Sequence, residues 1–303
     1  MVQGYQKPLY ILPFDHRASY EKGLFGWQEP LNEEQTAKVA ESKQVIYEGF
    51  KRAIADKVAK EKAGILVDEQ FGAEILRDAH KNGFITAYST EKSGQEEFDF
   101  AYGDDFAHHI EEFDPTFAKV LVRYNPEGDA TMNERQVERL QRLSKYLEQS
   151  NRLFMFELLI PPEKMQLERF DGDKDRYDLQ LRPQLLFKIL QLLQDAGIEP
   201  DVWKIEGLDR REDCEQAVKI AKRAGRNSVG LIVLGRGADE QHVVKWLQIA
   251  ASVPGFIGFA VGRTSFWTPI VDYEAKKLTA EEAANKIAKN FEEWIETFEK
   301  ARQ

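Results

Sequence analysis

Two stretches near the C-terminal end of the chain decide its fold. They read Val229-Gly230-Leu231-Ile232-Val233-Leu234-Gly235-Arg236-Gly237 and Phe256-Ile257-Gly258-Phe259-Ala260-Val261-Gly262-Arg263-Thr264. Each is a short apolar run, rich in branched and aromatic residues, that ends in Gly-Arg. Runs of this kind are typical of strands buried on both faces of a parallel sheet. The pattern therefore predicts strands with polar chemistry at their carboxyl ends.

Six similar runs precede these two, and amphipathic segments separate them. The eight runs cover residues 9–14, 64–67, 84–88, 117–122, 153–159, 202–205, 229–234 and 256–261. A doubly wound sheet would carry a glycine-rich dinucleotide fingerprint after its first strand, and residues 15–19 contain no glycine. The pattern instead favours an α/β fold of one domain, residues 1–303, built as a closed (β/α)8 TIM barrel with its reactive groups at the strand C-termini.

Helical signals lie between the runs. Residues 32–55 carry apolar side chains near helical spacing, and Thr279-x-x-Glu282 is typical of a capping box that opens the last helix. Within that helix, one face collects the apolar side chains of Ile287, Phe291, Trp294 and Phe298.

Composition narrows the class of function. The 303 residues are 42% hydrophobic and 31% charged, enough for a sizeable core, and the net charge is −10. This balance argues against broad binding to nucleic acid or to an anionic membrane surface. A single cysteine, Cys214, excludes an intrachain disulfide. The sequence shows neither a leader pattern nor an apolar stretch long enough to span a membrane, so we expect a cytoplasmic protein that acts on a small molecule. The sequence is compatible with a homo-oligomer.

Lys204 interrupts the sixth apolar run. Side chains alternate along a strand, so Lys204 and Glu206 share the face opposite Trp203 and Ile205. If the large apolar pair faces the helices, Lys204 points into the barrel, where desolvation lowers a lysine pKa toward the range of a nucleophilic amine. This favours Schiff-base chemistry, and a structural ion pair is the alternative.

Two neighbouring runs carry further interior charges. Lys119 and Arg123 fall on one face of the fourth run. Repulsion between them would lower the pKa of Lys119 and create an anion site, and pairing of Lys119 with a carboxylate is the alternative. Glu157 is the one carboxylate in the fifth run, which predicts a raised pKa and general acid–base work, or a structural partner for a lysine.

The Gly-Arg pairs suit phosphate. Gly235-Arg236 and Gly262-Arg263 follow the last two runs, where barrels commonly bind phosphate through backbone N–H groups and a guanidinium fork. We therefore expect a phosphorylated substrate. His108 and His109 point in different directions and no second cluster has metal spacing, so neither a metal nor a cofactor is expected.

Seven ordered motifs span nearly the whole chain. They are Asp15-His16-Arg17, Ile65-Leu66-Val67-Asp68 with Phe71-Gly72, Glu91-Lys92-Ser93-Gly94, Lys119-Val120-Leu121, Glu157-Leu158, Lys204-Ile205-Glu206 and Gly262-Arg263-Thr264. With them the chain resembles the class I tagatose-1,6-bisphosphate aldolase family. It resembles more closely the barrel domain fused to 5-dehydro-2-deoxygluconokinase in bacterial myo-inositol catabolism.

The resemblance implies a role for each matching residue. Lys204 becomes the Schiff-base lysine, Glu157 the proton-transfer group and Lys119 a neighbouring active-site cation of a carbon–carbon lyase that needs no metal. The residues expected to contact the substrate or its phosphate are Asp15, Glu91, Lys92, Arg123, Glu206, Gly235, Arg236, Gly262 and Arg263.

The implied reaction cleaves 2-deoxy-5-keto-D-gluconate 6-phosphate to dihydroxyacetone phosphate and malonate semialdehyde. Arg123 stands where the tagatose enzymes have an uncharged residue, which favours a carboxylate at C1 of the substrate. One alternative is a class I aldolase for another ketose phosphate, such as tagatose 1,6-bisphosphate or sulfofructose phosphate. A second is a non-catalytic barrel that partners a sugar kinase.

Overall fold

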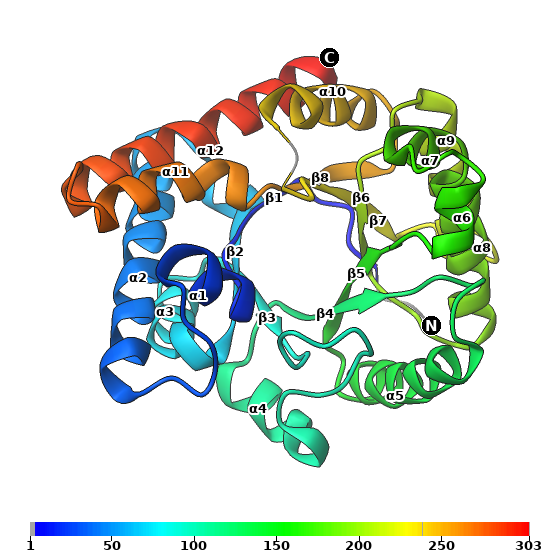
Figure 1. Ribbon diagram of the computed structural model, residues 1–303, viewed down its shortest axis with the longest axis horizontal. Coiled ribbons are helices and arrows are strands. Elements are labelled where there is room, and N and C mark those ends of the chain that lie inside the picture. The colour runs from blue at the N-terminus through cyan, green and yellow to red at the C-terminus, as the bar shows by residue number, and fades with distance from the viewer. Residues whose placement is uncertain (1–3, 238, 303) are drawn as a thin grey trace.

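The computed structural model describes residues 4–237 and 239–302 and confirms the predicted (β/α)8 barrel (Figure 1). Residues 1–3, 238 and 303 of the predicted domain lie outside this part. Eight parallel strands close in sequence order: β1 (Leu9–Pro13), β2 (Ala63–Val67), β3 (Ile85–Ser89), β4 (Phe117–Arg123), β5 (Leu153–Leu159), β6 (Val202–Glu206), β7 (Gly230–Leu234) and β8 (Phe256–Ala260). Each predicted run matches a strand to within one residue at either end.

Helices surround the barrel. They are α1 (Ala18–Phe25), α2 (Glu33–Asp56), α3 (Glu69–Lys81), α4 (Phe106–Phe113), α5 (Ala130–Gln149), α6 (Lys164–Glu168), α7 (Lys174–Gln180), α8 (Arg182–Asp195), α9 (Arg211–Ala221), α10 (Glu240–Ala251), α11 (Arg263–Glu274) and α12 (Ala280–Arg302). Two 3₁₀ turns, Lys60–Lys62 and Gly103–Asp105, precede β2 and α4. Within the described chain, none of the helices is long and apolar enough to cross a membrane.

The predicted helix ends and faces are confirmed. The Asn32 side chain caps α2 by accepting from the Gln35 N–H at 2.8 Å. Thr279 and Glu282 form the capping box of α12, since the Thr279 N–H donates to Glu282 Oε2 at 2.8 Å and the Glu282 N–H to Thr279 Oγ1 at 3.2 Å. Its apolar face packs against α2 at Gly49, where a Cβ would lie 2.7 Å from Ile287 Cγ2.

Two apolar layers fix which way the strand residues point. Met155, Val202 and Ile232 belong to the cluster inside the barrel. Trp203, fully buried, belongs to the larger cluster between the sheet and the helices. Because neighbours on a strand alternate, Lys204 points inward as predicted.

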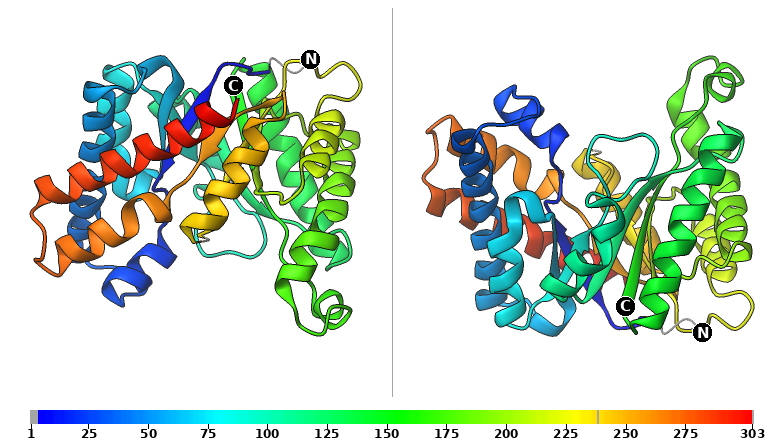
Figure 2. Two further views of the ribbon diagram at one scale, coloured as in Figure 1. Left: turned by 90° about the horizontal axis from the view of Figure 1, so that it is seen from above. Right: turned by 90° about the horizontal axis from the view of Figure 1, so that it is seen from below.

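The carboxyl ends of the strands form the face that carries the site. Figure 2 shows both chain ends on the opposite face, while α1 and the segment with α6 and α7 project beyond the carboxyl ends of the strands. These projections stand on either side of the barrel mouth (Figure 2).

Candidate active site

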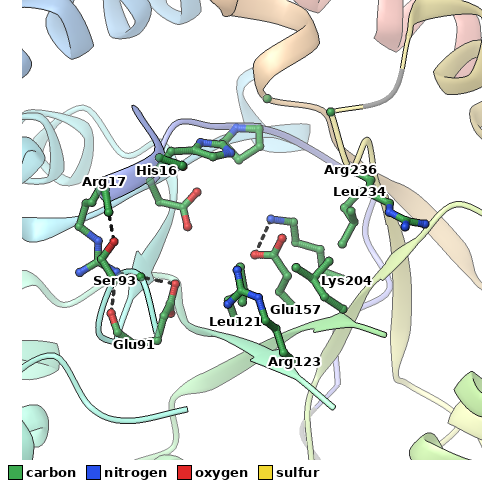
Figure 3. A pocket seen from close by; sticks show the side chains of 18 of the residues that line it. His16, Arg17, Glu91, Ser93, Leu121, Arg123, Glu157, Lys204, Leu234 and Arg236 are labelled. Carbon is green, nitrogen blue, oxygen red and sulfur yellow. Dashed lines mark hydrogen bonds and ion pairs between the residues drawn. The ribbon is translucent and has the colours of Figure 1, made fainter. Parts of the chain in front are cut away.

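A cavity of about 400 Å³ opens at the carboxyl ends of the strands, the usual place for the active site of a barrel enzyme. Ten of the predicted site residues line it: Asp15, Glu91, Lys92, Arg123, Glu157, Lys204, Gly235, Arg236, Gly262 and Arg263. Several of these side chains converge on the cavity in Figure 3.

Lys119 is the centre of a buried charge cluster. Its ammonium lies 2.7 Å from Asp15 Oδ2, 2.7 Å from Glu91 Oε1 and 2.9 Å from Glu157 Oε2. Lys204 contacts the same Glu157 oxygen at 2.8 Å (Figure 3). Lys119 is fully buried beneath these carboxylates and is not among the residues that line the cavity. The cluster thus joins Lys204 to three carboxylates through one oxygen of Glu157.

Register explains why these charges meet. Glu157 pairs with Lys204 between β5 and β6 and with Leu121 between β4 and β5. Lys119, two residues before Leu121, lies on the same inward face one layer deeper. The strand pattern therefore predicts that Glu157 lies beside both lysines.

The charges reverse two predicted pKa shifts. Burial alone would raise the pKa of Glu157, but Lys119 and Lys204 outweigh it and the pKa is lowered, so the predicted rise is wrong. Burial alone would lower the pKa of Lys119, but Asp15, Glu157 and Glu91 outweigh it and hold that pKa far above its usual range. The predicted fall is wrong because the carboxylates, not Arg123, are the nearest charges to Lys119.

Asp15 responds in the same direction. Burial would raise its pKa, but the positive charges of Lys119 and Lys204 hold it well below the usual range. Both Asp15 and Glu157 are therefore carboxylates at neutral pH. The resting site offers Lys204 an ionised acceptor for its proton.

Supporting side chains that the sequence reasoning missed orient the carboxylates. Ser89 Oγ donates to Asp15 Oδ2 at 3.0 Å. Arg17 Nη2 donates to the Glu91 carbonyl oxygen at 2.6 Å and lies 4.0 Å from its Oε1. The position of Arg17 in the Asp15-His16-Arg17 motif, directly after the first strand, is the feature of the sequence that could have indicated this role.

Three cations at the cavity have no ion-pair partner within residues 4–237 and 239–302: Lys92, Arg123 and Arg263. Arg123, at the end of β4, has a guanidinium that donates to the Gln95 carbonyl oxygen at 2.9 Å. Arg263 begins α11 and packs over Gly237, where a Cβ would lie 2.6 Å from Arg263 Nη2. The two Gly-Arg motifs thus come together, and an anion can find open guanidinium groups here.

Arg236 and Glu206 are differently placed. Arg236 Nε lies 3.0 Å from Glu206 Oε1, and its Nη1 lies 2.8 Å from Asp178 Oδ2 of α7. Glu206 also accepts from the Ile160 N–H at 2.9 Å and is buried away from the cavity lining. The structure therefore places Glu206 behind Arg236 as its partner, whereas Arg236 itself reaches the cavity.

His16 also lines the cavity, and the sequence motif that contains it predicts no particular role for it. Its ring lies edge-on to Phe266, with the ring centres 5.9 Å apart.

The described residues contain no group of three or more His, Cys, Asp or Glu side chains placed to hold a metal ion. The expectation that the site works without a metal or cofactor stays a prediction.

The fold and the site together define a class of protein. It is a (β/α)8 barrel with two lysines in its interior and a cavity, lined by arginine and lysine side chains, at the carboxyl ends of its strands. The chain belongs to the family described as "Uncharacterized protein conserved in bacteria (DUF2090)", whose pattern matches residues 2–302. No curated protein matches it in sequence.

Solved structures share the fold. Fructose-bisphosphate aldolase from Plasmodium falciparum is 15% identical with a TM-score of 0.63, over 97% of this chain and 91% of that one. Cgl0159 from Corynebacterium glutamicum is 17% identical with a TM-score of 0.58, over 97% and 88%. Fructose-bisphosphate aldolase from Slackia heliotrinireducens is 12% identical with a TM-score of 0.54, over 92% and 85%. At these identities the likeness shows the fold.

Proposed function

We propose that the protein is a class I aldolase that cleaves 2-deoxy-5-keto-D-gluconate 6-phosphate to dihydroxyacetone phosphate and malonate semialdehyde. The observation that carries the proposal is the pair of Lys204 and Glu157, 2.8 Å apart at a cavity with unpaired cations. The fold shared with two fructose-bisphosphate aldolases adds support. The proposed reaction belongs to cytoplasmic myo-inositol catabolism.

Lys204 begins the reaction once it has passed a proton to Glu157. The free amine adds to the C5 ketone, and Glu157 returns the proton to the hydroxyl of this adduct, which leaves as water to give an iminium ion. Lys119, still charged, stabilises Glu157 as the carboxylate that can next accept the C3 hydroxyl proton, directly or through a water.

The iminium then acts as the electron sink. The C3–C4 bond breaks, its electron pair moves to C4 as an enamine, and C3 becomes the aldehyde of malonate semialdehyde. A proton returned to C4 restores the iminium, and water hydrolyses it to free Lys204 and dihydroxyacetone phosphate. The carbonyl chemistry requires the buried amine and a proton carrier, which Lys204 and Glu157 supply.

The open cations match a substrate with an anion at each end. In a closed barrel of eight strands, β4 and β8 lie opposite each other and β6 lies midway between them along the sheet. Arg123 ends β4, Lys204 is on β6, and Arg263 follows β8. In our proposal Arg123, with Lys92 nearby, binds the C1 carboxylate. Arg263 binds the C6 phosphate together with Gly235 and Gly262. Arg236 also binds this phosphate, in exchange for one of its present carboxylate partners.

A bisphosphate or a sulfonated ketose phosphate is the second candidate, because Lys92 and Arg123 suit any second anion. A comparison of kcat/KM for the two kinds of substrate separates the candidates, and Arg123→Leu tests whether this arginine binds the second anion. A charged hydrogen bond contributes about 1.5–3 kcal/mol, so we expect KM for the keto acid to rise about tenfold to a hundredfold. Arg77→Leu, at an exposed arginine of α3, is the control and leaves KM unchanged. Equal losses by Arg123→Leu with the keto acid and with a ketose monophosphate would refute the carboxylate role.

A further inference from the structure

Two leucines line the cavity, and the proposed mechanism gives them no task. They are Leu121 of β4 and Leu159 of β5. Each is half-buried, so part of its side chain is open to a ligand in the cavity. Figure 3 shows Leu121 among the side chains at the cavity, together with Arg123 and Glu157. Leucine neither donates nor accepts hydrogen bonds, so this pair offers a substrate an apolar surface.

The pairing of β4 with β5 fixes where the two leucines lie. Leu121 is the register partner of Glu157, and Leu159 is the register partner of Arg123. Alternate residues of a strand share a face, so all four side chains point toward the barrel interior, as Lys204 does. Two residues of a strand span about 6–7 Å. The leucines therefore fill the step of about this length between the level of Glu157 and the level of Arg123.

That step corresponds to one carbon of the proposed substrate. Glu157 accepts the proton of the C3 hydroxyl, and Arg123 binds the C1 carboxylate. C2, which joins these two carbons, must then lie over the leucines. C2 is a methylene group in the proposed substrate, whereas ketose bisphosphates and sulfonated ketose phosphates carry a hydroxyl on the corresponding carbon. A hydroxyl placed against the leucines would leave water without gaining a hydrogen bond from them.

We propose that Leu121 and Leu159 are specificity-determining residues that select a substrate with a methylene group at C2. The inference rests on the proposed aldolase function and deepens it, since it makes a 3-oxo acid without a 2-hydroxyl group the preferred aldehyde half. An apolar pocket rejects a substrate with one added hydroxyl by up to about a hundredfold, so we expect a preference of about tenfold to a hundredfold.

Two aldehydes test this in the direction of aldol addition. Malonate semialdehyde has the methylene group, and tartronate semialdehyde has a hydroxyl in place of one of its hydrogens. Each is offered with dihydroxyacetone phosphate, and consumption of dihydroxyacetone phosphate gives kcat/KM for the aldehyde. Wild type should favour malonate semialdehyde by about tenfold to a hundredfold. This ratio tests the inference without any variant.

Variants locate the preference. Leu121→Asn and Leu159→Asn each put an amide where the C2 hydroxyl would lie, so each should reduce the ratio by up to about tenfold, the value of one ordinary hydrogen bond. Leu121→Met and Leu159→Met are the matched controls, because they keep an apolar side chain of similar volume and should keep the ratio. Thermal melting shows which variants fold. The two leucines lie on different strands, so either asparagine variant can serve if the other does not fold.

The outcomes separate this inference from the proposed function. Equal use of the two aldehydes by wild type, or an unchanged ratio in the folded asparagine variants, would overturn the role of the leucines. Equal reductions by asparagine and methionine would assign the preference to shape instead of polarity and would also overturn it. In each of these cases a borohydride-reduced adduct of dihydroxyacetone phosphate on Lys204 would leave the proposed aldolase chemistry standing. Absence of that adduct in wild type would remove the proposed function and this inference with it.

Discussion

Replacing Lys119 by methionine removes the charge at the centre of the buried cluster and keeps a side chain of similar length. Three carboxylates, at 2.7, 2.7 and 2.9 Å from the ammonium, lose their shared partner. Removing one partner of a buried ion pair costs about 3–5 kcal/mol of stability, and three partners put Lys119→Met at the upper end of that range. With an unfolding entropy of about 2.1 cal/mol/K per residue, a loss of about 5 kcal/mol lowers Tm by about 8 °C in a chain of this length.

The loss should also depend on pH. Lys119 and Lys204 together hold the pKa values of Asp15 and Glu157 low against burial, so removing Lys119 should shift both pKa values upward. A carboxyl whose pKa is higher in the folded state than in the unfolded state loses stability as pH rises through that range. The Tm gap between wild type and Lys119→Met should therefore widen from pH 5 to pH 8.

Calorimetry at several pH values measures both effects. Lys188→Met, at an exposed lysine of α8 without an ion-pair partner among the described residues, is the control and should change stability by less than about 0.5 kcal/mol. A Lys119→Met protein that melts within about 2 °C of wild type, with a gap independent of pH, would refute the view that Lys119 neutralises the cluster.

Two further predictions concern buried carboxyl groups. Glu157→Gln removes the carboxylate 2.8 Å from Lys204, so kcat for retro-aldol cleavage should fall by about 10²–10⁴-fold in steady-state assays; an unchanged kcat would exclude Glu157 as proton carrier. Glu21 of α1 is fully buried, and neither of its carboxyl oxygens has a hydrogen-bond partner within the described chain. Burial and, to a smaller extent, the negative charge of Glu29 raise the pKa of Glu21 to about 7. Glu21→Leu should therefore stabilise the fold by about 1–3 kcal/mol at pH 8 and by less at pH 5, where Glu21 is protonated; chemical denaturation that shows no pH dependence would contradict this.

The sequence predicts the barrel well because short-range information suffices for it. Apolar runs mark each strand to within a residue, and the alternation of Trp203 with Lys204 assigns the inward face. The same alternation brings Glu157 beside Lys204, since both lie on inward faces of neighbouring strands. For the cavity, the polar residues after each run identify most of the lining.

Pairings between distant residues are what the sequence does not show. Asp15 lies 104 positions from Lys119 in the chain, and Glu91 lies 28 positions from Lys119. The direction of the pKa shifts depends on both of these contacts with Lys119. Likewise Glu206 turns to Arg236, whose backbone takes a left-handed φ of 50° in the loop after β7. Such partners follow from loop conformations that residue patterns on the strands do not encode.

The central claim is that Lys204 forms a Schiff base, and borohydride trapping tests it most directly. The protein is incubated with dihydroxyacetone phosphate, reduced, and digested for peptide mass spectrometry, with Lys204→Ala in parallel. Our account predicts a reduced triose phosphate on Lys204 in wild type and none at that position in Lys204→Ala. A folded wild-type protein that binds phosphate and yields no adduct on Lys204 would contradict it and favour a barrel without aldolase chemistry.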